Sequence, residues 1–306
     1  MAAVILKALS MVLVIAVAYT FKRCGVLGEG SKDAVSKLVM YLTLPAAIIT
    51  SFDSYERDDS LLILAILGFG FNLFFYLVGC LVSCRGKRED KVFSTLNYPG
   101  YNIGSFTLPF VQNFLGALGV VTTCMFDMGN SVMCTGGSFA LTAALFGAED
   151  EKVTLKDFFK KLFSSVPFDV YLGLLVMSQV GLKFPKTLLT LMAPAAAANG
   201  FMAMVMLGLM FEIKFKKAYF WTAIKTLGSR YLLMAVLALL CWHFLPLALE
   251  QRQVLVVVLF SPMSALSPVF TDKCGGDSGL SGFLSSLSII LSVIIMTALI
   301  GILGIL

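Results

Sequence analysis

The chain has 306 residues, of which 58% are hydrophobic and 13% are charged, and its mean hydropathy is +0.91. A soluble domain of this length needs a larger share of charged surface, and the formal net charge of +5 is scattered rather than gathered into a basic patch. These properties exclude a soluble protein and a nucleic-acid partner. They predict an all-α integral membrane protein.

Apolar runs near the length that crosses a bilayer, about 20 residues, recur along the whole chain. The first run has no basic segment before it and no small-residue cleavage site after it, so we interpret it as a span rather than a signal peptide. The ten predicted transmembrane helices are, in chain order, 3–20, 33–52, 60–83, 92–114, 118–147, 162–181, 187–211, 219–245, 251–271 and 279–305.

The longest polar connection, 148–161, divides the chain into two halves with five predicted spans each, 1–147 and 162–306. Together the halves form one transmembrane domain. Because five is odd, the second half enters the membrane from the opposite side. We therefore expect two inverted five-helix repeats, a common plan of secondary transporters.

Lys and Arg are distributed unevenly between alternate connections. Of the 23 basic residues, 18 belong to one set of connections or to the span ends beside them. Basic residues favour the cytoplasmic side. The pattern predicts insertion in the plasma membrane with both termini on the non-cytoplasmic side.

Proline pairs interrupt the fourth span of each half, at Pro99 and Pro109 and at Pro262 and Pro268. A proline lacks an N–H group and breaks or kinks a helix. Simple kinks are one interpretation. Two breaks in matching spans instead favour a binding site near the midplane, where the start of a half-helix attracts a carboxylate. The polar side chains beside these breaks are Asn102, Ser105, Thr107, Ser264 and Ser267.

Several motifs resemble the auxin efflux carrier family of membrane permeases in order and spacing, over essentially the whole chain. The fourth span carries Asn102-x-Gly104-x-x-x-Leu108-Pro109. The other matching segments are Gly25 through Leu44-Pro45, Pro194 with Met204 to Gly208, and Pro262 with the turn Gly275-Gly276-Asp277. The long central cytoplasmic domain of plant members is missing, so a compact prokaryotic-type permease is the closer likeness.

The resemblance implies a bile-acid-symporter-like fold in which spans four and nine cross as broken helices, with Asn102, Gly104, Pro109 and Pro262 at the crossing. It implies transport of organic anions such as malate, malonate or an auxin-like monocarboxylate, and a homodimer. The sequence departs from the family at Ser267-Pro268, where an asparagine or another polar residue is more usual.

The deepest acidic residue is Asp127, about 13 Å into the fifth span at 1.5 Å per residue. With Asn130 it is a candidate for binding a proton or a sodium ion, since ionisable groups at such depth are usually functional. A structural hydrogen bond to another helix is the alternative. We expect Lys37 and Arg230 to extend to the cytoplasmic surface, which leaves no cation fixed at the midplane and favours a monoanion.

Three functions fit a helical membrane protein. The paired breaks favour a secondary transporter that works by alternating access. A non-transporting sensor or binding module with the same fold is the alternative. An enzyme is not expected, because the chain has no HExxH or GxSxG motif and only one histidine, His243. We expect no cofactor and no metal site.

Overall fold

The computed structural model describes residues 2–28, 30–53, 60–147, 155–211 and 219–304. Within these ranges the chain is helical, and its only β-type pairing is an isolated antiparallel bridge between Tyr101 and Met263. The predicted all-α class is confirmed.

The helices of the first half follow one another in the order α1 (Ala2–Arg23), α2 (Ser31–Leu38), η1 (Val39–Thr43), α3 (Leu44–Asp53), α4 (Ser60–Val82), α5 (Arg88–Asn97), η2 (Ile103–Thr107), α6 (Leu108–Val132), η3 (Met133–Gly137) and α7 (Ser138–Phe146). Those of the second half are α8 (Leu155–Leu162), α9 (Val166–Gln179), α10 (Lys186–Met210), α11 (Phe220–Phe244), α12 (Leu249–Leu259), α13 (Ser267–Lys273) and α14 (Ser278–Ile302). The three η elements are π-helical turns.

Seven helical stretches of the described chain are long and apolar enough to cross a bilayer, namely Ile5–Arg23, Ser31–Asp53, Leu61–Val82, Ile103–Phe146, Lys186–Met210, Phe220–Phe244 and Ser278–Ile302. They fit an integral membrane protein.

The stretch Ile103–Phe146 has 44 residues, about twice the length that a bilayer requires. Its backbone leaves helical geometry at Gly116 (φ 62°, ψ −155°), between the predicted spans 92–114 and 118–147. The sixth predicted span contains the short α9, and the ninth is divided between α12 and α13. Ten spans stay a prediction.

The predicted connection 148–161 contains most of an amphipathic helix, α8, whereas residues 148–154 lie outside the described part of the chain. Phe158 of α8 packs toward η3, where a Cβ on Gly136 would lie 3.4 Å from the Phe158 ring. The second half thus begins with a short helix against the first half rather than with an irregular linker.

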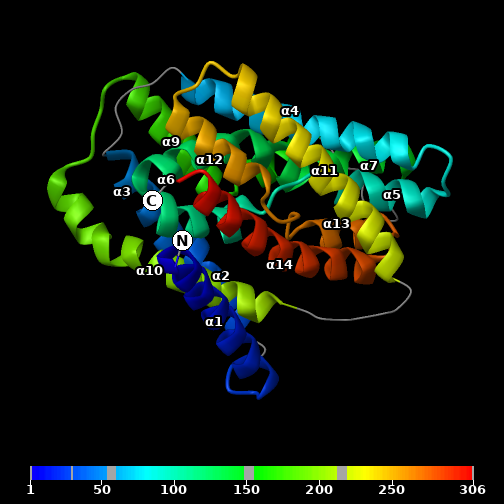
Figure 1. The fold of residues 1–306 in the computed structure, drawn as a ribbon, viewed down its shortest axis with the longest axis horizontal. Coiled ribbons are helices and arrows are strands. Elements are labelled where there is room, and N and C mark those ends of the chain that lie inside the picture. The colour runs from blue at the N-terminus through cyan, green and yellow to red at the C-terminus, as the bar shows by residue number, and fades with distance from the viewer. Residues whose placement is uncertain (1, 29, 54–59, 148–154, 212–218, 305–306) are drawn as a thin grey trace.

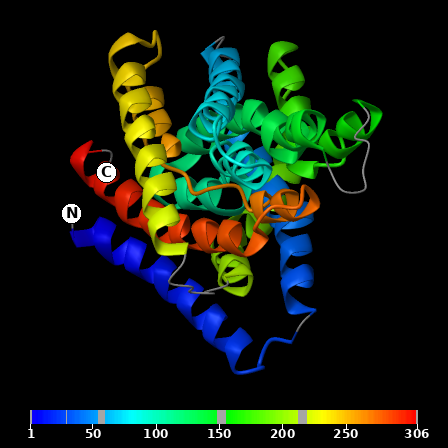
Figure 2. The ribbon, with the colours of Figure 1, turned by 90° about the vertical axis from the view of Figure 1, so that its right-hand side faces the viewer.

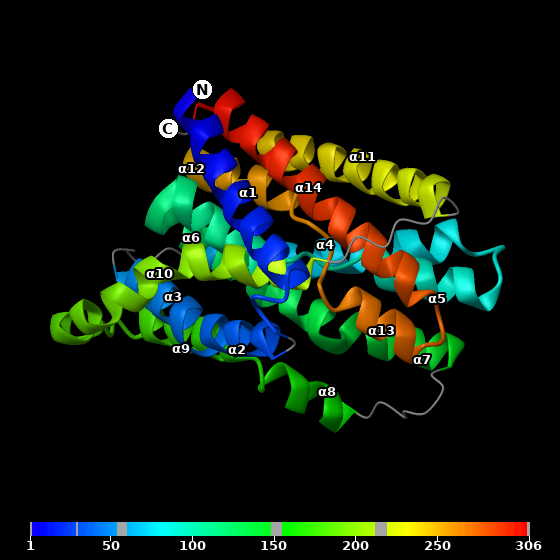
Figure 3. The same cartoon turned by 90° about the horizontal axis from the view of Figure 1, so that it is seen from below.

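Two groups of helices make up the molecule (Figures 1 and 3). The small bundle consists of α1, the continuous segment α2–η1–α3, α9 and α10. The crossover bundle consists of α4 to α7 and α11 to α14. The groups meet where α6 packs against α3, α9 and α10, and where α1 lies beside α14, which brings the two termini close together (Figure 2).

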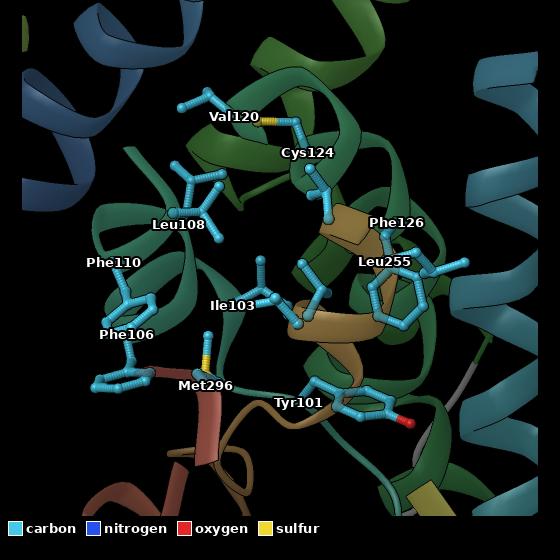
Figure 4. Packing of buried hydrophobic residues seen from close by; sticks show 14 of the residues in the cluster. Tyr101, Ile103, Phe106, Leu108, Phe110, Val120, Cys124, Phe126, Leu255 and Met296 are labelled. Atoms are coloured by element: carbon cyan, nitrogen blue, oxygen red, sulfur yellow. The ribbon is translucent and has the colours of Figure 1, made fainter. Parts of the chain in front are cut away.

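The chain is unwound twice inside the crossover bundle, at 98–102 and at 260–266. It runs from α5 to α6 across the molecule in one direction and from α12 to α13 in the other (Figure 3). Accordingly α5 packs against α13, and α6 packs against α12. The main hydrophobic core surrounds this crossing, with Tyr101 close to Phe126 of α6 (Figure 4).

Glycines allow α4 and α6 to approach very closely. A Cβ on Gly129 would lie 1.8 Å from the carbonyl oxygen of Ala65, and a Cβ on Gly68 would lie 2.0 Å from that of Phe126. Small residues permit such contacts between membrane helices. The closely packed helices α4 and α6 lie next to the first unwound segment.

Candidate functional site

The two unwound segments are joined by their backbones. The N–H of Asn102 donates to the carbonyl oxygen of Pro262 at 2.9 Å, beside the bridge between Tyr101 and Met263. Gly100 has φ +86°, and a Cβ there would lie 2.8 Å from the Cβ of Ser264. A glycine is therefore required at the closest approach of the segments.

Amide side chains and one guanidinium hold the first unwound segment. Asn72 of α4 accepts from the N–H of Gly100 at 2.7 Å. Asn130 of α6 accepts from the N–H of Tyr101 at 3.1 Å and donates to its carbonyl at 3.0 Å. Arg230 of α11 donates to the Gly100 carbonyl at 2.7 Å. Peptide groups that have left a helix cannot face lipid, and these side chains satisfy them.

Hydroxyl groups hold the second unwound segment. The N–H of Met263 donates to Ser288 Oγ of α14 at 3.0 Å, and the N–H of Leu266 donates to Ser264 Oγ at 3.1 Å. The N–H of Ser261 bonds to the carbonyl of Val258 at 3.0 Å. These bonds come from neutral groups, whereas the first segment also accepts a bond from the charged Arg230.

Two cavities adjoin the crossing, with volumes of about 510 and 440 Å³. Both lie between the small bundle and the crossover bundle, and Met210 of α10, Lys32 of α2 and Asn102 line both of them. Lys32 is exposed at the mouth, on the side that the charge pattern predicts to be cytoplasmic. The larger volume suits a small organic solute.

All three π-helical turns face the larger cavity. Met40 and Tyr41 of η1, Gly104 and Ser105 of η2, and Cys134 of η3 line it. The turns η1 and η2 both end immediately before a Leu-Pro pair, where the missing proline N–H disturbs regular α-helix. Such turns recur at functional sites.

Most of the predicted site residues gather at this cavity. Asn102 lines both cavities, and the larger one is also lined by Gly104, Ser105, Asp127, Asn130 and Ser264. Pro262 contributes its carbonyl to the crossing. Pro109 and Ser267 line neither cavity and are buried within α6 and at the start of α13.

Asn102 offers the free polar group that a solute needs. Its carboxamide makes no hydrogen bond within the described residues, although its own carbonyl accepts from Thr107 Oγ1 at 2.9 Å. Gly104 and Ser105 follow it in the first turn of η2, where backbone N–H groups have no partner inside the helix. Together they present hydrogen-bond donors to a carboxylate in the larger cavity.

Asp127 is 6% exposed and lines the same cavity. Its Oδ1 accepts from Asn130 Nδ2 at 2.7 Å, and its Oδ2 accepts from the hydroxyl of Tyr171 at 2.9 Å. The carboxylate thus links the crossing to α9 of the small bundle. Among the described residues, no group of three or more His, Cys, Asp or Glu side chains can hold a metal ion.

Arg230 lies where the sequence analysis did not expect it. It is 1% exposed and stacks on Phe75 and Tyr101, so the expectation that it extends to the surface was wrong. Its Nε and Nη1 have no hydrogen-bond partner within the described residues. Arg230 lies ten residues after the start of α11, about 15 Å along the helix. That depth was the feature of the sequence that indicated a buried side chain. Lys37, by contrast, is exposed.

Asn72 was the other residue that the sequence analysis missed. It is the one strongly polar side chain in the described part of α4, Leu61–Val82, and it is fully buried. An isolated amide in an apolar span signals an unsatisfied backbone group nearby, although nothing in the sequence says which one.

A chain of hydrogen bonds joins the two bundles on the far side of the larger cavity. Thr43 Oγ1 donates to Asn199 Oδ1 at 3.0 Å, Asn199 Nδ2 donates to Gln112 Oε1 at 3.0 Å, and Gln112 Nε2 donates to the carbonyl of Ala196 at 3.1 Å. These residues belong to η1, α10 and α6. None of Thr43, Asn199 and Gln112 lines the larger cavity, and Asn199 lies seven residues before the cavity-lining Met206 on α10.

No protein-family model matches the sequence, and no curated protein is similar enough to be matched to it. The resemblance to the auxin efflux carrier family rests on the motifs alone and stays a prediction.

Proposed function

We propose that the chain is a secondary transporter that carries a small organic anion across the plasma membrane by alternating access at the crossing. The observation that carries the proposal is the hydrogen-bonded crossing of two unwound segments beside a cavity lined by the free carboxamide of Asn102. Irregular backbone at membrane depth is tolerated where it is buried in protein or lines a wet cavity.

Backbone geometry supports two inverted repeats of five spans. Glycines with positive φ follow the first predicted span of each half, Gly25 (75°) after α1 and Gly181 (70°) after α9, and the second part of each interrupted span, Gly116 (62°) and Gly275 (71°). The packing is also matched, because α5 meets α13 and α6 meets α12. This pairing and the distribution of basic residues support the ten-span arrangement with both termini outside, which we include in the proposal.

The two bundles supply the moving parts of alternating access. The cavities separate them on one side of the crossing, whereas the bonds among Thr43, Asn199 and Gln112 join them on the other. A shift of one bundle that breaks this chain and closes the cavity mouth exposes the crossing to the opposite side. The structure corresponds in this scheme to a state open toward the predicted cytoplasm.

Counterflow in proteoliposomes tests the proposal. Vesicles loaded with unlabelled malonate, malate or indole-3-acetate are diluted into the matching labelled compound, and we expect uptake of at least one label above protein-free vesicles. Asn102→Ala should lower that uptake at least tenfold. The matched control is Asn113→Ala, because Asn113 Nδ2 bonds to Pro109 within its own helix.

The alternative of a binding module predicts a different result. A carboxylate would then raise the thermal stability of the purified protein while counterflow stays at the level of protein-free vesicles. Wild-type transport by both Asn102→Ala and Pro262→Ala would show that the solute does not bind at the crossing.

A further inference from the structure

The membrane interior holds two opposite charges that face the same residue without touching each other. Arg230 donates to the carbonyl of Gly100 and stacks on the ring of Tyr101, 5.5 Å from its centre. Asp127 bonds to Asn130, which holds both the N–H and the carbonyl of Tyr101. Neither charge has an ionic partner among the described residues, since their hydrogen bonds go only to these groups and to Tyr171.

A buried guanidinium without a carboxylate beside it opposes folding. Within the described part of the chain, Arg230 also makes only one of its possible hydrogen bonds, although a buried donor without a partner is unfavourable. An apolar residue of similar volume would fill the space at less cost. The charge at this position therefore points to a role in function.

Only one of the two groups can change its charge by exchanging a proton with water. An arginine stays protonated in proteins, whereas a carboxylate can bind a proton. Asp127 lines the larger cavity, and Arg230 lies behind Gly100 and lines neither cavity. Arg230 is thus the fixed charge of the crossing, positive in every state, whereas the charge of Asp127 varies with the binding of a proton.

The charge of the occluded site follows from these two roles. The empty site is neutral, with Arg230 positive and Asp127 negative. Addition of a monoanion alone gives a charge of −1, and addition of a proton alone gives +1. A monoanion together with a proton on Asp127 leaves the site neutral again, and neutral states are the ones that a low-dielectric interior favours.

We propose that the transporter couples each monoanion to one proton, with Arg230 as the fixed counter-charge and the carboxylate of Asp127 as the proton carrier. The inference rests on the proposed function and adds the coupling ion to it. The proton passes from water in the cavity to Asp127 when the anion binds, and it leaves to the other side when the anion leaves. The cycle moves no net charge.

The neighbours of Asp127 are compatible with this exchange. The titratable groups that face it are the thiols of Cys124 and Cys134 and the hydroxyl of Tyr171. From α4 it is faced through Asn130 by the amide of Asn72. The cations at the cavity, Lys32 and Lys37, are exposed to solvent. No neighbouring carboxylate among the described residues competes with Asp127 for the proton.

A proton gradient across proteoliposomes tests the coupling, with labelled indole-3-acetate as the monoanion probe. An inward proton gradient should drive its accumulation at least fivefold above the level without a gradient. A membrane potential set with potassium and valinomycin should change this accumulation less than twofold. Malonate and malate are dianions near neutral pH, so each of them would carry a net charge of −1 with one proton and should respond to the potential. Asp127→Asn should keep counterflow at a reduced rate and lose the accumulation. The matched control, the exposed Asp169→Asn, should accumulate like the wild type.

The fixed charge is tested on α11. Arg230→Met should lose counterflow at least tenfold, whereas Arg230→Lys retains part of it. Lys225→Met, the same substitution type at an exposed position of α11, should transport like the wild type. Thermal unfolding in detergent separates lost function from lost folding, because we expect Arg230→Met to be at least as stable as the wild type.

The outcomes separate the two proposals. Wild-type counterflow without any response to the proton gradient overturns the coupling and leaves the transporter intact. The same holds if Asp127→Asn still accumulates the probe under a proton gradient, or if stable Arg230→Met transports normally. Absence of counterflow for all three probes overturns the transporter itself, and the coupling falls with it.

Discussion

The two unwound segments occupy matching places in the halves of the chain but are held by different chemistry. The first, 98–102, is fixed by two asparagines and an arginine from α4, α6 and α11. The second, 260–266, is held by serine hydroxyls and by its own backbone. The difference teaches that the same backbone break can be satisfied either by amide and guanidinium side chains or by small hydroxyls.

In the proposed mechanism, the difference between the partners of the two segments has a functional consequence. The two buried charged side chains, Arg230 and Asp127, both lie beside the first segment. In this mechanism the first segment therefore provides the charges that act on the bound anion. The second segment supplies a carbonyl at Pro262 and a hydroxyl at Ser264 that is 2.9 Å from Cys134 Sγ. It is the segment with fewer constraints, and we expect it to be the more mobile of the two.

The largest effect is expected from Gly129→Ala, because the added Cβ would lie 1.8 Å from the carbonyl oxygen of Ala65 and 2.6 Å from the N of Phe69. Backbone must move to accommodate it, and α4 and α6 separate behind the first segment. We expect a loss of about 3 kcal/mol or more of unfolding free energy, measured by denaturation in mixed micelles.

The matched control is Gly228→Ala on α11, where a Cβ meets nothing within 4 Å. Alanine is the better helix former, so the unfolding free energy should stay the same or rise by up to about 1 kcal/mol. Similar losses for both variants would contradict the close packing of α4 on α6.

Asn130→Ala should have the next largest effect. It removes the bonds of Asn130 to the N–H and the carbonyl of Tyr101, to the amide of Asn72 and to the carboxylate of Asp127. At roughly 0.5–1 kcal/mol for each lost bond, the unfolding free energy should fall by about 2–4 kcal/mol. Asn113→Ala, on the same helix, loses only a bond to Pro109 and should fall by less than half as much in the same denaturation experiment.

Ser288→Ala should have the smallest effect, because it removes one bond to the N–H of Met263 and a local bond to the carbonyl of Ser285 in its own helix. We expect a loss of about 1 kcal/mol, and a rise in hydrogen exchange that is confined to 260–266. A loss as large as that of Asn130→Ala would show that the two segments are held equally firmly, and the comparison between them would fail.

Sequence patterns located much of the candidate site because the chemistry that interrupts a helix is local. Pro99 and Pro109 mark the first break, and Pro262 and Pro268 mark the second. The structure brings Asn102, Ser105 and Ser264 to one cavity. Ser267 was named for the same reason but is buried at the start of α13 and lines neither cavity.

The sequence by itself determined that the protein is helical and apolar and where its helices are interrupted, because hydropathy and the missing N–H of proline act on neighbouring residues. Only the tertiary structure decided what meets at the interruptions. Asn72, Asn130 and Arg230 come from helices far apart in the chain, and the partner of a buried polar group depends on which helix faces align. No pattern within one helix encodes that alignment, so the depth of Arg230 along α11 could indicate burial but not the carbonyl to which it donates.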